Sequence, residues 1–308
     1  MKTYTKINSQ YKRYMGIRSK DVVIPNEKWR KFSNLIILGD FADPAIEFLK
    51  NNIFEATEKI DGTNSKIAFY PSTGTFKVGG KTDKANNQQG QFEFLTEIGN
   101  RILPKLKEIF PPEKAVFRPT KGDDNLPIFL SPHIESDQII WDNVGNKATA
   151  ESIYGLQFEE DPIYIYGEYF GKGIQKAGSK YLSDHDFVVF DINIQGWWIP
   201  KEMRDDICHQ LGLKQVPSLG NMTLLDAEKV VRAGFKTHID AVDHSLLAEG
   251  IVLRSPIGLK DSHGNRIIVK VKHCDYVAYD AARKEFTDKE FNEFNDWYHK
   301  NIENLKKQ

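Results

Sequence analysis

The chain has 308 residues, of which 40% are hydrophobic and 28% are charged, and its formal net charge is −1. This composition is ordinary for a globular protein with a sizeable core, and it excludes a fibre or a disordered chain. With so little net charge, contact with nucleic acid has to come from a local basic patch rather than from a global positive field.

The cysteines and the N-terminal segment bear on location. Cys208 and Cys274 form no CxxC pair, so two free thiols in a reducing cytoplasm explain them better than a structural zinc site. Residues 1–20 lack the apolar core of a secretory signal, and no run of about 18 apolar residues indicates a membrane span. We therefore expect a cytoplasmic protein without a membrane contact.

The first third of the chain predicts a lead-in, strands and a long helix. Residues 1–53 form a mixed segment that ends in a short helix at 44–49. Residues 54–82 have the pattern of two strands separated by a turn at 71–74. Apolar residues at helical spacing predict a helix over 91–110, which a double proline ends.

The middle of the chain predicts an irregular insertion followed by buried strands. Residues 113–150 are rich in turn formers and lack a clear period, which indicates an insertion at the rim of a site. Residues 163–168 and 187–192 are short apolar runs typical of buried strands. Residues 201–213 and 223–235 are predicted helices.

The last part of the chain predicts a strand pair and a helical tail. Residues 249–254 and 266–272 form two strands joined across the turn-rich residues 261–265. A capping-box pattern at Thr287 predicts the start of the last helix. Aromatic residues at helical spacing are more often core than a nucleic-acid surface, so we assign to the core Phe291, Phe294, Trp297 and Tyr298.

The segment Glu58-Lys59-Ile60-Asp61-Gly62-Thr63-Asn64 places a lysine in a turn between acids and next to a strand-like run. A lysine amine attacks an electrophile only when it is unprotonated, and desolvation and nearby cations favour that form. Lysines in exposed turns of this kind are also common without any such role. The decision between the two depends on what accompanies Lys59 further along the chain.

Four later segments alternate apolar runs with charged residues: Ile165-Tyr166-Gly167-Glu168-Tyr169-Phe170-Gly171, Phe187-Val188-Val189-Phe190-Asp191-Ile192, Ala248-Glu249-Gly250-Ile251-Val252-Leu253-Arg254 and Ile268-Val269-Lys270-Val271-Lys272-His273. Together with the lysine segment, this order resembles the motif series of the covalent nucleotidyltransferase superfamily, which contains the ATP-dependent RNA and DNA ligases and the capping enzymes. The Thr63-Asn64 pair resembles the RNA ligase branch that seals nicks in duplex RNA. The resemblance covers about residues 54–274.

This resemblance implies an α+β fold, in which an adenylation domain unrelated to ATP-grasp enzymes has antiparallel sheets around an ATP cleft. The nucleotidyltransferase domain then comprises residues 54–274, with the insertion at 113–150. Residues 1–53 pack on this domain, and residues 275–308 form a short helical segment. Only about 35 residues follow the last motif, which is too short for the OB domain of DNA ligases and capping enzymes.

The resemblance also implies which residues are catalytic. Lys59 is the nucleophile that attacks the α-phosphate of ATP. Lys270 and Lys272 lie at i and i+2 of a strand, so both project to one face and would bind phosphate there. By itself, such a pair is more often a solvated strand face. Glu168 holds the ribose, and Glu249, with Glu168 as a second carboxylate, binds a divalent metal.

The remaining nucleotide contacts follow from the same motifs. Phe190 matches the aromatic residue that stacks on adenine, with Phe187 as the local alternative. Lys81 stands where relatives usually carry arginine, so it keeps the charge but loses the bidentate fork. Besides both carboxylates and the lysine pair, the predicted cofactor-binding residues are Glu58, Ile60, Asp61, Gly62, Asn64, Lys81, Phe190 and Arg254.

The function that the resemblance implies is ATP-dependent RNA ligation with Mg²⁺ or Mn²⁺. AMP passes from the lysine to an RNA 5′-phosphate, and a 3′-hydroxyl then displaces it, for example at a nick in a duplex during RNA repair. We expect a monomer. Two enzymatic alternatives are an adenylyltransferase with another acceptor and a ligase of DNA or RNA–DNA ends. A non-catalytic RNA-binding module is disfavoured, because it has no use for the complete set Lys59, Glu168, Glu249, Lys270 and Lys272.

Overall fold

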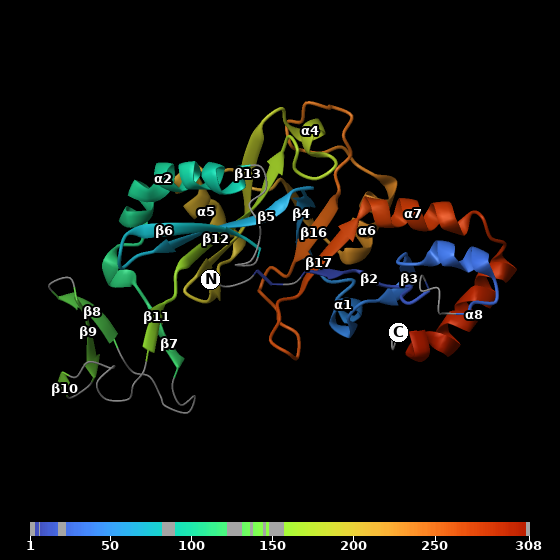
Figure 1. The fold of residues 1–308 in the computed structure, drawn as a ribbon, viewed down its shortest axis with the longest axis horizontal. Coiled ribbons are helices and arrows are strands. Elements are labelled where there is room, and N and C mark those ends of the chain that lie inside the picture. Colours follow the sequence, from blue (N-terminus) through green and yellow to red (C-terminus); the bar gives the residue numbers. More distant parts are fainter. Residues whose placement is uncertain are drawn as a thin grey trace. The chain divides into compact units, whose positions relative to one another are not determined.

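The computed structural model describes residues 4–5, 7–17, 23–81, 90–121, 131–135, 138–143, 146–147 and 157–305. The backbone forms two compact units, each built around its own five-stranded sheet (Figure 1). Unit 1 comprises Met1–Tyr4 and Asp61–Val216, and unit 2 comprises Thr5–Ile60 and Pro217–Gln308. The predicted mixture of helices and antiparallel sheets is therefore confirmed. The division at residues 53 and 274 stays a prediction about the sequence segments.

The sheet of unit 1 is antiparallel and has the strand order β14-β13-β12-β5-β6. The strands are β5 (Thr63–Tyr70), β6 (Thr75–Gly80), β12 (Ile163–Gly171), β13 (His185–Ile194) and β14 (Trp197–Trp198). The two longest, β12 and β13, coincide with the predicted buried strands; β13 extends the predicted run at both ends, and β12 extends it at the C-terminal end.

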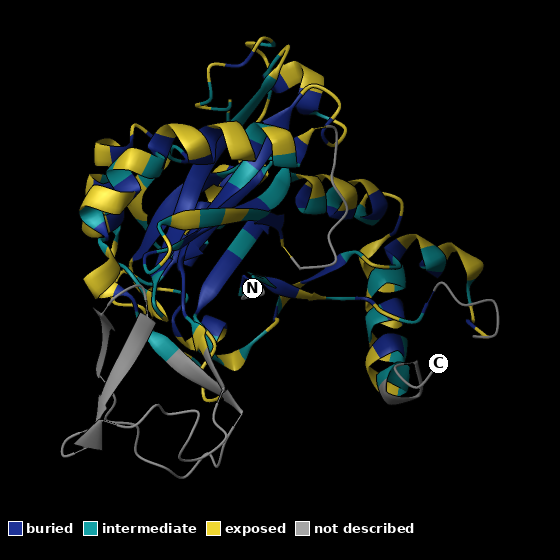
Figure 2. Ribbon diagram, turned by 60° about the vertical axis from the view of Figure 1, so that its left-hand side comes forward, coloured by how far each residue is buried: buried dark blue, intermediate teal, exposed yellow. Residues whose placement is uncertain are grey.

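Two helices cover one face of this sheet: α2 (Gln91–Ile109) and α5 (Lys201–Leu211). The core between them includes Ile165 and Tyr169 of β12 packed with Leu95 of α2. Because side chains alternate along a strand, Glu168 of β12 points to the opposite face. The buried, intermediate and exposed residues of α2 alternate along the helix in Figure 2, as expected for an amphipathic helix on a sheet.

Short elements complete the described part of unit 1. They are η2 (Pro112–Lys114), the paired strands β7 (Phe117–Lys121) and β11 (Gln157–Glu160), the strands β8 (Ser131–Glu135), β9 (Gln138–Asn143) and β10 (Asn146–Lys147), and α4 (Gly178–Tyr181). The predicted insertion at 113–150 thus contains strands where it is described. The rest of that insertion lies outside the described residues.

The sheet of unit 2 has the strand order β1-β17-β16-β4-β15. The strands are β1 (Asn8–Ser9), β4 (Phe54–Lys59), β15 (Ser218–Met222), β16 (Gly250–Arg254) and β17 (Ile268–Lys272), all antiparallel except the β1–β17 pair. The helices α6 (Leu224–Ala233) and α7 (His273–Arg283) bury a core with this sheet. None of the described helices is long and apolar enough to cross a bilayer.

The beginning and the end of unit 2 share a second core. It joins η1 (Glu27–Phe32) and β3 (Ile36–Phe41) to α8 (Asp288–Leu305). The strand β2 (Tyr11–Arg13), which pairs with β3, and the helix α1 (Pro44–Phe48) contribute instead to the core of the main sheet. Phe294 and Tyr298 are fully buried, which confirms that the aromatic stripe of the tail is core. The capping box is also confirmed, since Glu290 N donates to Thr287 Oγ1 at 3.3 Å and Thr287 N donates to Glu290 Oε2 at 2.8 Å.

Two of the predicted element patterns need correction. Residues 54–82 form three strands rather than two, because the Asp61-Gly62 turn separates β4 from β5 before the predicted turn at 71–74. Within the expected helical segment at 275–308, a start was predicted for the last helix alone, whereas the structure also has α7, which starts directly after β17. Its sequence is mixed, and it is stabilised by packing Tyr276 and Tyr279 into the core of unit 2, which no local pattern reveals.

Candidate active site

Basic side chains gather on one face of the unit 2 sheet. Ala56 of β4 and Val271 of β17 belong to the core under the helices. Because side chains alternate across a strand, Lys59, Lys270 and Lys272 project from the other face. The predicted common face for the two strand lysines is therefore confirmed, and the same face carries the proposed nucleophile.

Lys59 and Lys272 lie on either side of Gly250, the first residue of the central strand. Gly250 is the cross-strand partner of Lys59 in β4 and of Lys272 in β17. Glu249 precedes this glycine and accepts from both lysines: Lys59 Nζ binds Oε2, and Lys272 Nζ lies 2.6 Å from Oε1. The side chains of Lys59, Glu249 and Lys272 are 19%, 14% and 28% exposed, so solvent screens their interactions only in part.

The carboxylate of Glu249 changes the ionisation of Lys272. Burial, the largest single effect, lowers the pKa of Lys272, but the hydrogen bond and the negative charge of Glu249, with smaller contributions from Cys274 and Asp275, together outweigh it, so this pKa lies above its ordinary value. Lys272 is therefore a cation at neutral pH. A fixed cation of this kind is suited to binding a phosphate group.

Gly250 has a steric role that sets the spacing of this cluster. A Cβ atom at this position would lie 1.9 Å from the carbonyl oxygen of Val271, which belongs to the neighbouring strand and cannot move aside. Only glycine therefore allows β17 to approach β16 closely enough for Glu249 to reach both lysines.

We expect Gly250→Ala to lower the free energy of unfolding by about 3 kcal/mol, as overpacking against a backbone does. Gly258→Ala is the matched control, because Gly258 has a φ of +65° but nothing within 4 Å of an added Cβ. It should cost only about 1 kcal/mol of backbone strain. Urea unfolding of both variants checks this, and equal losses would show that the close approach of the strands is not what requires Gly250.

Of the other predicted residues of unit 2, Ile60 contacts this cluster, whereas Arg254 and Glu58 bind other groups. Arg254, at the far end of β16, is 5% exposed and donates to Thr57 Oγ1 at 2.9 Å. Ile60 is buried, and its carbonyl oxygen lies 3.4 Å from Lys59 Nζ. The Glu58 side chain points to the core face, away from Lys59, where Thr237 and His238 bind it. Nucleotide contacts by these residues stay predictions.

In unit 1, predicted residues meet on the sheet face opposite α2. Asn64 of β5 is the cross-strand partner of Glu168 in β12. An added Cβ on Gly62 would lie 2.8 Å from Glu168 Cγ and 2.5 Å from the Tyr169 carbonyl oxygen, so this glycine packs directly against the strand that carries Glu168. Asp61 precedes it in the same turn.

One polar atom of this face lacks a partner. Asn64 Oδ1 is buried and accepts no hydrogen bond from any described residue. A buried acceptor without a donor costs free energy, which a ligand hydroxyl or amine would recover. The same face also buries Lys66, the neighbour of Asn64 two residues along β5, at 0% exposure. Polar residues on a buried sheet face are typical of a binding site.

The two candidate aromatic residues of β13 lie on different faces. Phe187 belongs to the core under α2. Phe190 contacts the ring of Tyr4 edge-on at 5.0 Å between centroids, and Tyr4 also contacts Tyr166, which shares its face with Glu168. Phe190 is thus the aromatic residue on the side of Asn64 and Glu168, which favours it over Phe187. Phe190 is only 7% exposed, because Tyr4 packs against its ring.

Lys81 is exposed and directly follows β6, whose last residue, Gly80, is the partner of Ser65. The residues after it, Thr82 and Asp83, lie outside the described residues. The phosphate contact of Lys81 therefore stays a prediction.

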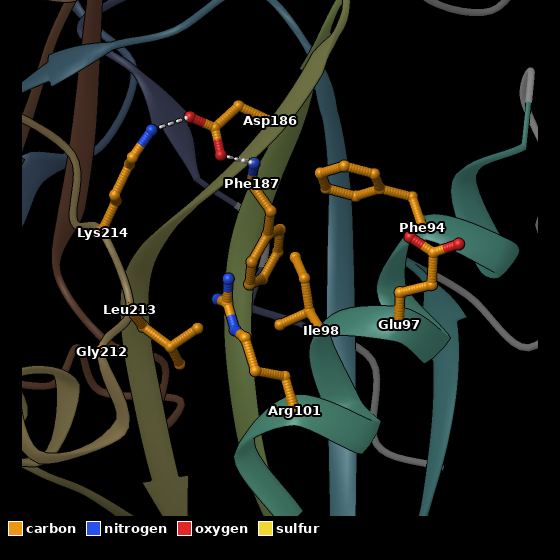
Figure 3. Close-up of a pocket in the computed structure, with 9 residues that line it drawn as sticks. All are labelled: Phe94, Glu97, Ile98, Arg101, Asp186, Phe187, Gly212, Leu213 and Lys214. Carbon is orange, nitrogen blue, oxygen red and sulfur yellow. Dashed lines mark hydrogen bonds and ion pairs between the residues drawn. The ribbon is translucent and has the colours of Figure 1, made fainter.

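Unit 1 also has a cavity of about 350 Å³, which Phe187 lines but Asn64, Glu168 and Phe190 do not. Figure 3 shows it between α2, the start of β13 and the segment after α5, with Phe94, Ile98, Phe187 and Leu213 as its apolar lining. Its lining is electrically balanced, because it carries two cations, Arg101 and Lys214, and two carboxylates, Glu97 and Asp186, of which Asp186 is paired with Lys214 at 2.6 Å. The cavity lies on the helix-covered face, opposite Glu168.

The described residues contain no group of three or more histidine, cysteine or carboxylate side chains placed to hold a metal. The residues that sequence analysis missed are Thr57, Thr237 and His238, which bind predicted site residues, and Tyr4. Each forms its hydrogen bond with a residue about 180 or more positions away in the sequence, so no local pattern could have identified it.

Comparison with known proteins finds one matching family model and several similar solved structures. The family model described as RNA ligase matches residues 52–272, and no curated protein matches the chain. Among solved structures, an RNA ligase of Naegleria gruberi with pyrophosphate has 17% identity and a TM-score of 0.48, and the alignment covers 78% of this chain and 55% of that chain. An apo mutant of that ligase has 15% identity and a TM-score of 0.47, with 79% and 55% covered. The chain thus spans about half the length of these proteins.

Proposed function

Because the chain belongs to the RNA ligase family, we propose that it is an ATP-dependent enzyme that joins RNA 3′-hydroxyl and 5′-phosphate ends. The observation that carries this proposal is the cluster of Lys59, Glu249 and Lys272 around Gly250. It combines a nucleophile, a carboxylate and a fixed cation on one sheet face, which are the groups that phosphoryl transfer requires.

In the first step, Lys59 Nζ attacks the α-phosphorus of ATP. A nitrogen–phosphorus bond forms, the bond from the α-phosphorus to the bridging oxygen breaks, and pyrophosphate leaves. Lys59 has to lose a proton before this attack, and its amine is bound to Glu249. Binding of ATP therefore has to be accompanied by separation of this pair.

Glu249 is suited to hold a divalent cation, because Mg²⁺ in such sites is usually bound by one or two carboxylates together with substrate phosphates and water. Its two oxygens are already placed among cations, each bound to a lysine. A bound Mg²⁺ or Mn²⁺ would neutralise phosphate charge and would release Lys59 from its anionic partner. Lys272 and Lys270 would then bind the phosphates, and Glu168 remains the proposed second carboxylate.

For the nucleotide, we infer that Glu168 and Asn64 contact the ribose and that Phe190 contacts adenine. The orphan acceptor Asn64 Oδ1 beside Glu168 supports this inference, because ribose hydroxyl groups are donors. Asp61, Gly62 and Lys81 complete the proposed nucleotide contacts. In the two later steps, the AMP moves to an RNA 5′-phosphate, and attack by the 3′-hydroxyl closes the phosphodiester and releases AMP.

The test of this proposal is a sealing assay. The protein, ATP and Mg²⁺ are incubated with a nicked RNA duplex that carries a labelled 5′-phosphate at the nick, and the products are separated on a denaturing gel. We expect a longer labelled strand that resists phosphatase. The same duplex with a 5′-hydroxyl is the control, and DNA and hybrid duplexes test the ligase alternative. Self-labelling with ATP but no joined product would instead support an adenylyltransferase with another acceptor.

A further inference from the structure

Glu58 is the most deeply buried charged residue beside Lys59, and its environment differs from that expected of a residue that binds a nucleotide. Its side chain is completely shielded from solvent and extends from β4 to the sheet face opposite Lys59. A carboxylate in such a place is expensive unless hydrogen bonds compensate for its lost hydration.

The compensating donors all come from one loop. The Thr237 hydroxyl donates to Glu58 Oε1, and the His238 main-chain N–H donates to Oε2 at 2.7 Å. The His238 ring contributes Nδ1 at 3.3 Å from the same oxygen. The Thr237 hydroxyl also accepts from the N–H of Ile239 at 3.2 Å, so the carboxylate and the loop backbone share one hydroxyl.

This loop is a small hairpin that ends at Glu249. Thr237 N donates to the carbonyl oxygen of Leu246 at 3.0 Å, and Ala248 N donates to that of Phe235 at 2.9 Å. Residues 235–237 thus pair with residues 246–248, and Glu249 follows the second arm directly. On the far side, His273 N donates to the carbonyl oxygen of Glu249 at 2.9 Å, which fixes its backbone against the start of α7.

We propose that Glu58 is a positioning residue whose buried carboxylate holds the 235–248 hairpin in register and thereby directs Glu249 toward Lys59 and Lys272. Both Lys59 and Glu249 are then fixed to the same strand, β4. Lys59 is part of this strand, and Glu249 is held to it through the hairpin and the Glu58–Thr237 hydrogen bond. β4 and β16 lie side by side in Figure 1. This inference rests on the proposed function, in which Glu249 binds the metal.

The consequence is a specific effect on metal use. Removing a group that hydrogen-bonds to a metal ligand and orients it typically changes metal affinity by about 10- to 100-fold. Loss of the Thr237 hydroxyl would leave Glu249 chemically intact but less well aimed. The metal concentration needed for half-maximal adenylylation should therefore rise, while the rate at saturating metal changes much less.

The test compares Thr237→Val, which removes the hydroxyl at nearly constant volume, with Thr237→Ser, which keeps it. Self-adenylylation with labelled ATP is titrated with Mn²⁺. We expect a midpoint about 10-fold higher for the valine variant and close to wild type for the serine variant. Thr223→Val, which removes the cap hydroxyl of α6, controls for loss of a hydroxyl in the same unit and should leave the midpoint unchanged.

A second readout does not depend on activity. Amide hydrogen exchange of residues 235–249 should be faster in Thr237→Val than in wild type and Thr237→Ser, because the hairpin loses its anchor. Unchanged exchange overturns the inference, and so does an unchanged metal midpoint in a protein that labels normally. If wild type takes up no label, the ligase proposal has failed, and the exchange result alone decides whether Glu58 anchors the hairpin.

Discussion

Lys59→Ala is expected to abolish covalent labelling by ATP that carries the label on its α-phosphate. Alanine has no nitrogen that could form the bond to phosphorus, and the neighbouring lysines cannot replace it. Lys272 is held by Glu249, and Lys270 lies two residues along β17, so neither amine occupies the position of Lys59 on β4. The measurement is a denaturing gel of wild type and variant after incubation with labelled ATP and Mg²⁺.

The matched control is Lys229→Ala, which removes a lysine that is 77% exposed on α6 of the same unit. Its labelling should equal that of wild type. The fold of Lys59→Ala should persist, because Glu249 keeps its pair with Lys272 and is not left as a lone buried charge. Persistent label on Lys59→Ala would place the nucleophile elsewhere, and absence of label on wild type would contradict the proposed mechanism.

Glu249→Gln is expected to slow self-adenylylation by about 100- to 1,000-fold, as loss of one preorganised charge in an active site does. The amide keeps the size of the side chain but cannot bind a divalent cation as a carboxylate does. It also leaves Lys59 and Lys272 without the anion that separates them. Single-turnover labelling over a range of Mg²⁺ and Mn²⁺ concentrations measures the effect.

Glu285→Gln provides the control, since Glu285 is half exposed and its ion pair with Lys31 lies on the surface of unit 2. Exposed pairs contribute about 1 kcal/mol or less, so this variant should label within about twofold of wild type. A Glu249→Gln protein with the metal response of wild type would exclude Glu249 as the metal ligand.

Glu249→Gln should also change how the stability of the protein depends on pH. Glu249 raises the pKa of Lys272 against the lowering effect of burial, so this pair stabilises the fold fully below the ordinary lysine pKa and less as pH rises through the raised value. The loss of unfolding free energy caused by Glu249→Gln should therefore be larger at pH 8 than at pH 11. Urea unfolding of both proteins at the two pH values measures it, and a deficit that grows with pH would have the wrong sign for this pair.

The sequence predicts which residues form the cluster around Gly250 but not how their side chains are arranged. Strand alternation was enough to place Lys270 and Lys272 on one face, because a period of two is a local property of the backbone. That Glu249 lies between Lys59 and Lys272 depends on β16 being the central strand between β4 and β17. Pairing of strands about 190 residues apart is decided by the whole core, which no window of sequence contains.

By itself, the sequence determined the long helix α2, the buried strands β12 and β13, the aromatic core of α8 and its cap, since each depends on neighbours a few residues away. The motif series also identified the family. Only the tertiary structure decided that Phe187 rather than Phe190 packs in the core under α2, that Arg254 is buried against Thr57, and that Glu58 binds Thr237. These outcomes depend on which distant groups satisfy a buried charge or ring, and that is settled when the sheets and helices pack.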